Sequence, residues 1–149
     1  NGSTAPQSAP VTGRDKWTGR YPHLGTGPLA ADVFTSPEQF ELERERIFKK
    51  VWLNVGRVEQ IPNAGDFFVK DIEICQTSIL VVRGADGQVR AFHNMCSHRG
   101  NKVCWDKAGN KPNFTCKFHG WVYGHEGDLK YVPDEEHFFD FKRDDHGMA

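Results

Sequence analysis

The stretch that decides the fold reads C-S-H-R-G-N-K-V at residues 96–103 and resumes as C-K-F-H-G-W at residues 116–121. Each segment offers one thiol and one imidazole, from Cys96 and His98 in the first segment and from Cys116 and His119 in the second. Such short spacing lets both side chains of a loop turn toward one point, and the intervening residues suffice for a hairpin. Thiolate sulfur and imidazole nitrogen are ligands of protein-bound zinc and iron. We therefore predict a metal centre held between two loops.

Two Cys and two His leave two kinds of centre open. One is a tetrahedral zinc ion, and the other is a [2Fe–2S] cluster with Cys on one iron and His on the other. Zinc patterns usually place the Cys residues together and the His residues together. Here the two types alternate along the chain. The alternation favours the cluster, in the arrangement of a Rieske centre, and zinc remains the alternative.

The two loops are similar to the cluster-binding signature of Rieske proteins, specifically of the large (alpha) subunits of Rieske non-haem iron ring-hydroxylating oxygenases. The similarity extends upstream into a segment that reads F-x-x-E-x-x-x-I-F-x-x-x-W-L-N-V-G-R. The matching residues are Phe40, Glu43, Ile47, Phe48, Trp52, Gly56 and Arg57, followed by Ile61, Pro62, Gly65 and Asp66. The resemblance covers residues 34–136 and implies the N-terminal Rieske [2Fe–2S] domain of such a subunit, with Cys96, His98, Cys116 and His119 as cluster ligands.

Short strands separated by turns dominate the rest of the pattern. Residue types that favour strands occur at 51–58, 67–72, 79–83, 88–93, 113–116, 121–123 and 129–132. Residues 62–65 and 84–87 are typical of turns. Ser36, Pro37 and Gln39 form the pattern of a capping box, which predicts a helix over residues 36–50. We predict an all-β, Rieske-type domain of small antiparallel sheets with two cluster-binding loops, preceded by one N-terminal helix.

Composition divides the chain into three segments. Residues 1–33 are rich in Gly, Pro, Ser and Thr without periodicity, which predicts a flexible arm. Residues 34–136 form the predicted Rieske domain. Residues 137–149 are acidic, and we predict a linker toward a catalytic domain that this stretch does not contain.

The charge and hydropathy patterns exclude several kinds of partner. A formal net charge of −1 gives no basic footprint for nucleic acid or for an anionic membrane surface. No apolar run reaches the length of a membrane span. The predicted partner is therefore another protein. With two of four cysteines assigned to metal, Cys75 and Cys104 are predicted to be free thiols in a reducing, cytoplasmic location.

A cluster with four protein ligands has no open position, so we predict one-electron transfer and assign no catalytic residue. The resemblance implies the domain through which electrons enter an aromatic-ring-hydroxylating dioxygenase of aromatic hydrocarbon catabolism. In that family a ferredoxin or reductase donates the electron. A mononuclear Fe(II) held by two His and one carboxylate in a second domain receives it. The only late candidates, Asp140, Asp144, Asp145 and His146, are wrongly spaced for that triad, so this chain alone should only carry electrons.

The resemblance also implies assembly with neighbouring oxygenase subunits, as a homotrimer or an alpha–beta hexamer. A free-standing low-potential Rieske ferredoxin, an electron carrier and not an enzyme, is the alternative function. The segment from Ser36 to Trp52 favours the oxygenase, because ferredoxins of this type usually begin directly at the strands. High-potential Rieske proteins have Cys where Asn101 and Phe118 stand here. They also have a Ser and a Tyr that donate hydrogen bonds to sulfur, and Trp121 stands where that Ser would be. Fewer donors to sulfur predict a low potential.

Overall fold

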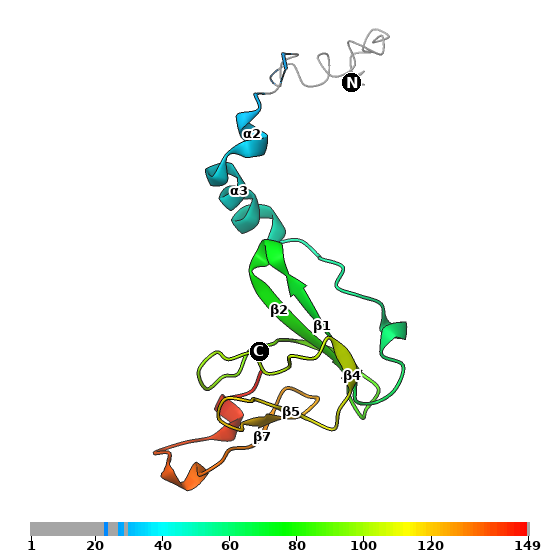
Figure 1. The fold of residues 1–149 in the computed structure, drawn as a ribbon, viewed down its shortest axis with the longest axis vertical. Coiled ribbons are helices and arrows are strands. Elements are labelled where there is room, and N and C mark those ends of the chain that lie inside the picture. Colours follow the sequence, from blue (N-terminus) through cyan, green and yellow to red (C-terminus); the bar gives the residue numbers. More distant parts are fainter. Residues whose placement is uncertain (1–22, 24–26, 29, 149) are drawn as a thin grey trace, which may run out of the picture. The chain divides into compact units, whose positions relative to one another are not determined.

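The computed structural model describes residues 23, 27–28 and 30–148 (Figure 1). The chain forms two compact units, Asn1–Glu41 and Leu42–Ala149, and each is described here by itself. Most of the predicted flexible arm, at residues 1–22, 24–26 and 29, lies outside the described residues.

Helical structure precedes the strands, as the capping pattern predicts. Helix α2 spans Asp32–Thr35, and helix α3 spans Pro37–Glu43. The Ser36 hydroxyl accepts a hydrogen bond from the backbone N–H of Gln39 at 3.1 Å, which satisfies an N–H group that the first helical turn leaves unpaired. The predicted single helix over residues 36–50 differs in its second half. There the backbone widens into the π-helix η2, Arg44–Phe48.

The larger sheet contains four antiparallel strands in the order β3-β2-β1-β4. These are β1 at Asp66–Ile72, β2 at Thr77–Arg83, β3 at Val89–His93 and β4 at Ala108–Asn110. The first three confirm predicted strands. The fourth is missing from the prediction because Ala-Gly-Asn has a low strand propensity. It forms where Gly109 pairs with Phe67 of β1, and a β-carbon at Gly109 would already lie 3.3 Å from the Phe67 ring.

The strand predicted at residues 51–58 is wrong. In this segment side chains satisfy backbone N–H groups that a neighbouring strand would otherwise pair. The side-chain oxygen of Asn54 accepts a hydrogen bond from the N–H of Gly56 at 3.1 Å. The side-chain oxygen of Gln60 accepts one from the N–H of Arg57 at 2.7 Å. The chain then turns through the 3-10 helix η3, Val58–Gln60.

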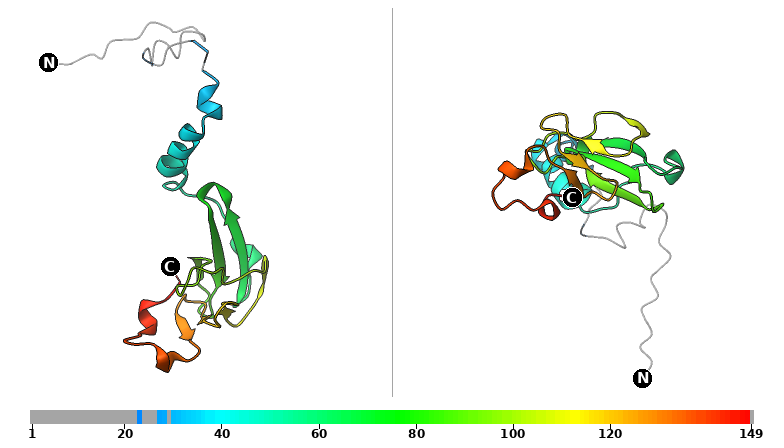
Figure 2. Two further views of the ribbon diagram at one scale, coloured as in Figure 1. Left: turned by 60° about the vertical axis from the view of Figure 1, so that its left-hand side comes forward. Right: turned by 90° about the horizontal axis from the view of Figure 1, so that it is seen from below.

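A smaller antiparallel sheet, in the order β5-β6-β7, lies at the end of the larger sheet away from the β1–β2 hairpin tip (Figure 2). Its strands are β5 at Phe114–Thr115, β6 at Val122–Tyr123 and β7 at Leu129–Tyr131, each shorter than predicted. The two sheets share one core, in which the rings of Phe67 and Phe114 meet edge to face with centroids 5.2 Å apart. The all-β fold class is thereby confirmed.

The acidic C-terminal segment packs onto this unit. The Met148 side chain is buried in the core, and its N–H donates to the Gly127 carbonyl at 2.6 Å. Upstream, an ion pair joins two 3-10 helices, η5 (Glu135–His137) and η6 (Arg143–Asp145). It is formed by the Arg143 guanidinium and the Glu135 carboxylate. The segment is thus ordered through residue 148, and its role as a linker stays a prediction.

Candidate metal centre

The two predicted ligand loops are built by the same backbone turn. In the first loop, between β3 and β4, the N–H of Gly100 donates to the carbonyl of Cys96 at 2.8 Å. In the second loop, between β5 and β6, the N–H of Gly120 donates to the carbonyl of Cys116 at 3.0 Å. Both glycines have positive φ, +72° and +74°, a conformation that glycine adopts without steric penalty. Each loop therefore folds back tightly enough to aim its Cys and His side chains in one direction.

The imidazoles of the two loops face each other. The rings of His98 and His119 lie with centroids 4.6 Å apart, and His98 stacks on Trp121 at 4.7 Å with an interplanar angle of 9°. The Nδ1 atom of His98 is buried and has no hydrogen-bond partner. Buried polar atoms are rarely left unpaired, and a metal ligand atom is one reason for it. Burial, together with the charges of His119 and Arg99, lowers the pKa of His98 and favours the neutral, ligating form.

The two thiols of the loops also face each other. Cys96 and Cys116 are buried, with 2% and 1% of their surfaces exposed, and each thiol contributes to the pKa shift of the other. Burial raises the pKa of Cys96. Burial also acts to raise the pKa of Cys116, but hydrogen bonds from the Phe118 amide and the Asn101 side chain outweigh it, so that this pKa is lowered. Cys116 is therefore the thiol that ionises more readily, and thiolate is the form that binds metal.

Each of the two sulfurs has one side-chain hydrogen-bond partner. The Tyr123 hydroxyl lies 3.1 Å from the Sγ of Cys96, and the Asn101 amide nitrogen lies 3.6 Å from the Sγ of Cys116. The backbone N–H of Ser97 donates to the Tyr123 oxygen at 3.1 Å, which directs the phenol toward the first loop. The sequence pattern indicates Tyr123 only as a strand residue. Tyr123 stands two residues after Trp121, and side chains two residues apart on a strand point to the same face. This spacing is the signal that could have identified Tyr123.

The spacing of the four side chains differs from that of a single-ion site. Among the described residues, one set of three His, Cys, Asp or Glu side chains has its ligand atoms all within 4.8 Å of one another. This set is the exposed Asp134, Glu136 and His137. No three of the four loop ligands come that close together. A tetrahedral zinc ion would hold ligand atoms within about 4 Å of each other. The geometry therefore fits a centre with two metal ions better than a centre with one.

Comparison with known proteins agrees with this geometry. Residues 51–142 match the family described as the Rieske [2Fe-2S] domain. The chain belongs to this family. Its cofactor is accordingly a Rieske-type [2Fe–2S] cluster, and the zinc alternative is wrong.

The relatives of this Rieske domain are oxygenase subunits. It is 42% identical over 114 residues to the biphenyl 2,3-dioxygenase subunit alpha of Rhodococcus jostii, which covers 76% of this chain and 24% of the relative. It is 38% identical over 128 residues to the anthranilate 1,2-dioxygenase large subunit of Acinetobacter baylyi, covering 85% and 27%. Naphthalene 1,2-dioxygenase from Rhodococcus sp. has a similar structure, with a TM-score of 0.75 at 34% identity, covering 80% and 27%. The chain thus spans about a quarter of the length of these relatives.

Within the described part of the chain, no helix is both long enough and apolar enough to cross a bilayer.

Replacing Tyr123 by phenylalanine will lower the midpoint potential of the Rieske cluster. The change keeps the buried ring and removes the hydroxyl 3.1 Å from Cys96 Sγ. A hydrogen bond to sulfur stabilises the more negative, reduced state, and losing about 1 kcal/mol corresponds to about 40 mV for one electron. Protein-film voltammetry measures the shift, with Tyr131→Phe at an exposed position as the control. Equal potentials for Y123F and the unaltered chain would contradict a role for the hydroxyl.

Proposed function

We propose that Cys96 and Cys116 bind one iron of the [2Fe–2S] cluster and that His98 and His119 bind the other. The observation that carries this assignment is the buried Nδ1 of His98, which lacks a hydrogen-bond partner in a ring whose centroid lies 4.6 Å from that of the second imidazole. The lowered pKa of His98 and the lowered pKa of Cys116 support it, because each shift favours the form that ligates iron.

The cluster supplies a site that accepts and releases one electron. The chain would exclude water from the two buried cysteine ligands and fix their positions. Tyr123 and Asn101 donate toward the two sulfurs, and the Trp121 ring covers one face of His98. His98 is also approached by the Phe138 ring, with centroids 6.4 Å apart, whereas His119 is exposed. The two imidazoles thus differ in their access to solvent and to partners.

We infer that the chain is the domain through which electrons enter a Rieske oxygenase. The names of its relatives, among them biphenyl, anthranilate and benzene dioxygenase subunits, support an aromatic substrate for the parent protein. A ferredoxin or reductase would donate the electron, and a mononuclear Fe(II) outside residues 1–149 would receive it. Assembly as a homotrimer or an alpha–beta hexamer, and a cytoplasmic location, belong to the same proposal. So does the division into an arm at 1–33, a domain at 34–136 and a linker at 137–149.

The proposal is tested on the chain loaded with iron and sulfide. We expect about two iron and two sulfide ions per chain and an electron paramagnetic resonance signal that appears only after reduction by dithionite. Pulsed measurements on that signal should detect hyperfine coupling to two nitrogen nuclei, from His98 and His119. A cluster without nitrogen coupling would contradict the ligand assignment. A chain that retains zinc and no iron would contradict the proposed function.

A further inference from the structure

The hydroxyl of Tyr123 has more hydrogen-bond contacts than it has protons. Tyr123 is fully buried, so its hydroxyl finds its partners within the chain. Three groups lie near the phenolic oxygen: the Sγ of Cys96 at 3.1 Å, the backbone N–H of Ser97 at 3.1 Å and the hydroxyl of Ser97 at 3.0 Å. The N–H group of Ser97 can only donate. The single proton of the phenol is therefore directed to one or both of the other two groups.

The proton of the Ser97 hydroxyl is already engaged. It is donated to the backbone carbonyl of His146 at 2.5 Å, and a carbonyl oxygen has no proton to donate in return. A hydroxyl has one proton, so Ser97 can take part in its 3.0 Å contact with Tyr123 only as an acceptor. Two oxygen atoms at this distance repel each other unless a proton lies between them. The contact therefore draws the phenolic proton of Tyr123 toward Ser97.

The Sγ of Cys96 is the second acceptor for the same proton. In the cluster-loaded chain this sulfur would be a thiolate, which accepts hydrogen bonds and donates none. Tyr123 thus has one proton for two acceptors, the Sγ of Cys96 and the hydroxyl oxygen of Ser97. A stronger hydrogen bond to Ser97 means a weaker one to the sulfur.

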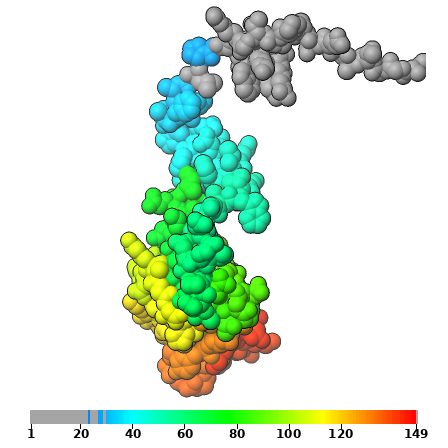
Figure 3. Space-filling model, turned by 90° about the vertical axis from the view of Figure 1, so that its right-hand side faces the viewer, coloured from blue at the N-terminus to red at the C-terminus, as the bar shows by residue number. Residues whose placement is uncertain are grey.

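The carbonyl that engages Ser97 belongs to the C-terminal segment, which packs onto the unit through apolar side chains. Met148 is buried in the core. The Phe141 ring lies 5.5 Å from the Trp121 ring and stacks on the His146 ring at 4.7 Å, measured between centroids. Figure 3 shows the segment, in red, lying against the rest of the unit. The His146 carbonyl is therefore held in place by contacts outside the two cluster loops.

We propose that Ser97 is a positioning residue that competes with Cys96 for the Tyr123 proton, and that the C-terminal segment controls this competition through the His146 carbonyl. The inference rests on the proposed function, because it concerns a hydrogen bond to a cluster ligand. While the carbonyl holds the Ser97 proton, Ser97 accepts from Tyr123 and weakens the bond to sulfur. Without the carbonyl, the Ser97 hydroxyl turns and donates to the Tyr123 oxygen, which leaves the phenolic proton to the sulfur.

The sign of the effect on the midpoint potential follows from charge. The reduced cluster has one more negative charge than the oxidised cluster, so a stronger hydrogen bond to Cys96 stabilises the reduced form and raises the potential. The packed C-terminal segment therefore lowers the potential, and its release raises it. Because residues 137–149 are the proposed linker, a movement of this linker would change the potential of the cluster.

The test measures the midpoint potential of the cluster-loaded chain by protein-film voltammetry. Ser97→Ala removes the competing acceptor, keeps the backbone N–H that binds Tyr123 and alters an exposed residue, so the core is left intact. We expect the equilibrium constant for reduction to rise about threefold, or about 28 mV at about 59 mV per tenfold change. Tyr123→Phe, in contrast, should lower the potential. Ser97→Thr keeps a hydroxyl and should leave the potential unchanged.

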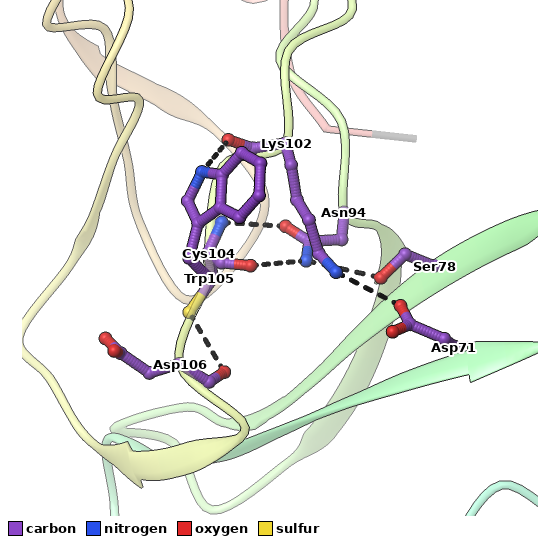
Figure 4. Close-up of polar contacts among 7 residues, drawn as sticks. All are labelled: Asp71, Ser78, Asn94, Lys102, Cys104, Trp105 and Asp106. Carbon is purple, nitrogen blue, oxygen red and sulfur yellow. Dashed lines mark hydrogen bonds and ion pairs between the residues drawn. The ribbon is translucent and has the colours of Figure 1, made fainter.

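Ser78→Ala is the matched control for the loss of a hydroxyl. Figure 4 shows Ser78 in a network with Asn94 and Cys104 that contains none of the four candidate ligands. This variant should have the potential of the unaltered chain. A double variant, Ser97→Ala with Tyr123→Phe, should match Tyr123→Phe alone, because Ser97 acts through the phenol.

Met148→Ala tests the role of the C-terminal segment. Loss of this buried side chain should speed hydrogen exchange of the backbone amides at residues 141–148 and raise the equilibrium constant for reduction about twofold. Added to Ser97→Ala, the substitution should raise the potential no further. Phe139→Ala is its control, because it truncates a side chain of the same segment that is 98% exposed. It should change neither the exchange nor the potential.

Three results would overturn the proposal while leaving the proposed function in place. They are an unchanged or lowered potential in Ser97→Ala, an equal rise when Ser97→Ala is combined with Tyr123→Phe, and faster exchange in Met148→Ala without a change of potential. The Ser97 variants decide the competition for the proton even if Met148→Ala fails to fold. An unaltered chain that forms no cluster, or a cluster without coupling to two nitrogen nuclei, would instead overturn the proposed function.

Discussion

Replacing Cys116 by serine will abolish cluster binding, so that the iron content falls from about two ions per chain to near zero. Cys116 is 1% exposed, and its thiol ionises readily because of backbone and Asn101 hydrogen bonds. A serine hydroxyl in the same place keeps its proton at neutral pH and offers iron a much weaker ligand. The loops would also lose the folding free energy that metal binding contributes, so we expect a lower melting temperature. Iron analysis, visible absorbance and thermal denaturation measure these effects.

Cys75→Ser is the control for this substitution. The Cys75 thiol contacts the Phe48 carbonyl at 3.7 Å and lies in the 3-10 helix η4, Glu73–Cys75, at the β1–β2 hairpin tip. This variant should keep about two irons per chain and its absorbance spectrum. A Cys116→Ser chain that retained both irons would show that a ligand other than Cys116 completes the cluster. Equal iron loss in both variants would attribute the effect to general damage.

The two pairs of candidate ligands could be recognised in the sequence because each pair is local, and their assignment as ligands stays a prediction. Cys96 and His98 lie in one five-residue turn closed by Gly100, and residues 116–120 repeat this turn. No long-range contact is needed to bring a Cys and a His of the same loop together. The strands at 67–72, 79–83 and 88–93 were predictable for a similar reason, since their residue types favour strands and turns separate them.

Other features depend on partners distant in the sequence. Strand β4 consists of Ala-Gly-Asn and exists because β1, about forty residues earlier, offers it a pairing edge. The hydroxyl of Tyr123 reaches Cys96 across 27 residues. The C-terminal segment packs onto the core through Met148 and Phe141. The acidic composition of the segment gives no indication of this apolar packing. Such contacts follow from the tertiary fold and leave no local pattern.

The predicted low potential rests on a smaller number of hydrogen-bond donors to sulfur than in high-potential Rieske proteins, and the structure shows two side chains near the sulfurs. Tyr123 and Asn101 each donate toward one ligand sulfur. Both bonds favour the reduced cluster, so they act to raise the potential. The low potential therefore stays a prediction, and the Tyr123→Phe measurement determines how much of the potential this donor contributes.

Replacing Asn94 by leucine will destabilise the cluster-loaded chain by about 3 kcal/mol or more, because two buried backbone groups lose their partners at once. Asn94 is 4% exposed, and its amide binds the N–H and the carbonyl of Cys104 as a neighbouring strand would. Leucine has a similar volume and makes neither bond. Thermal denaturation should therefore show a melting temperature lower by about 6 °C or more.

Ser78→Ala tests the same region with a smaller change. The Ser78 hydroxyl lies 3.4 Å from the Asn94 amide nitrogen, at the limit of a useful hydrogen bond, so its loss should cost under about 1 kcal/mol. A leucine variant that melts like the serine variant would contradict the structural role of Asn94.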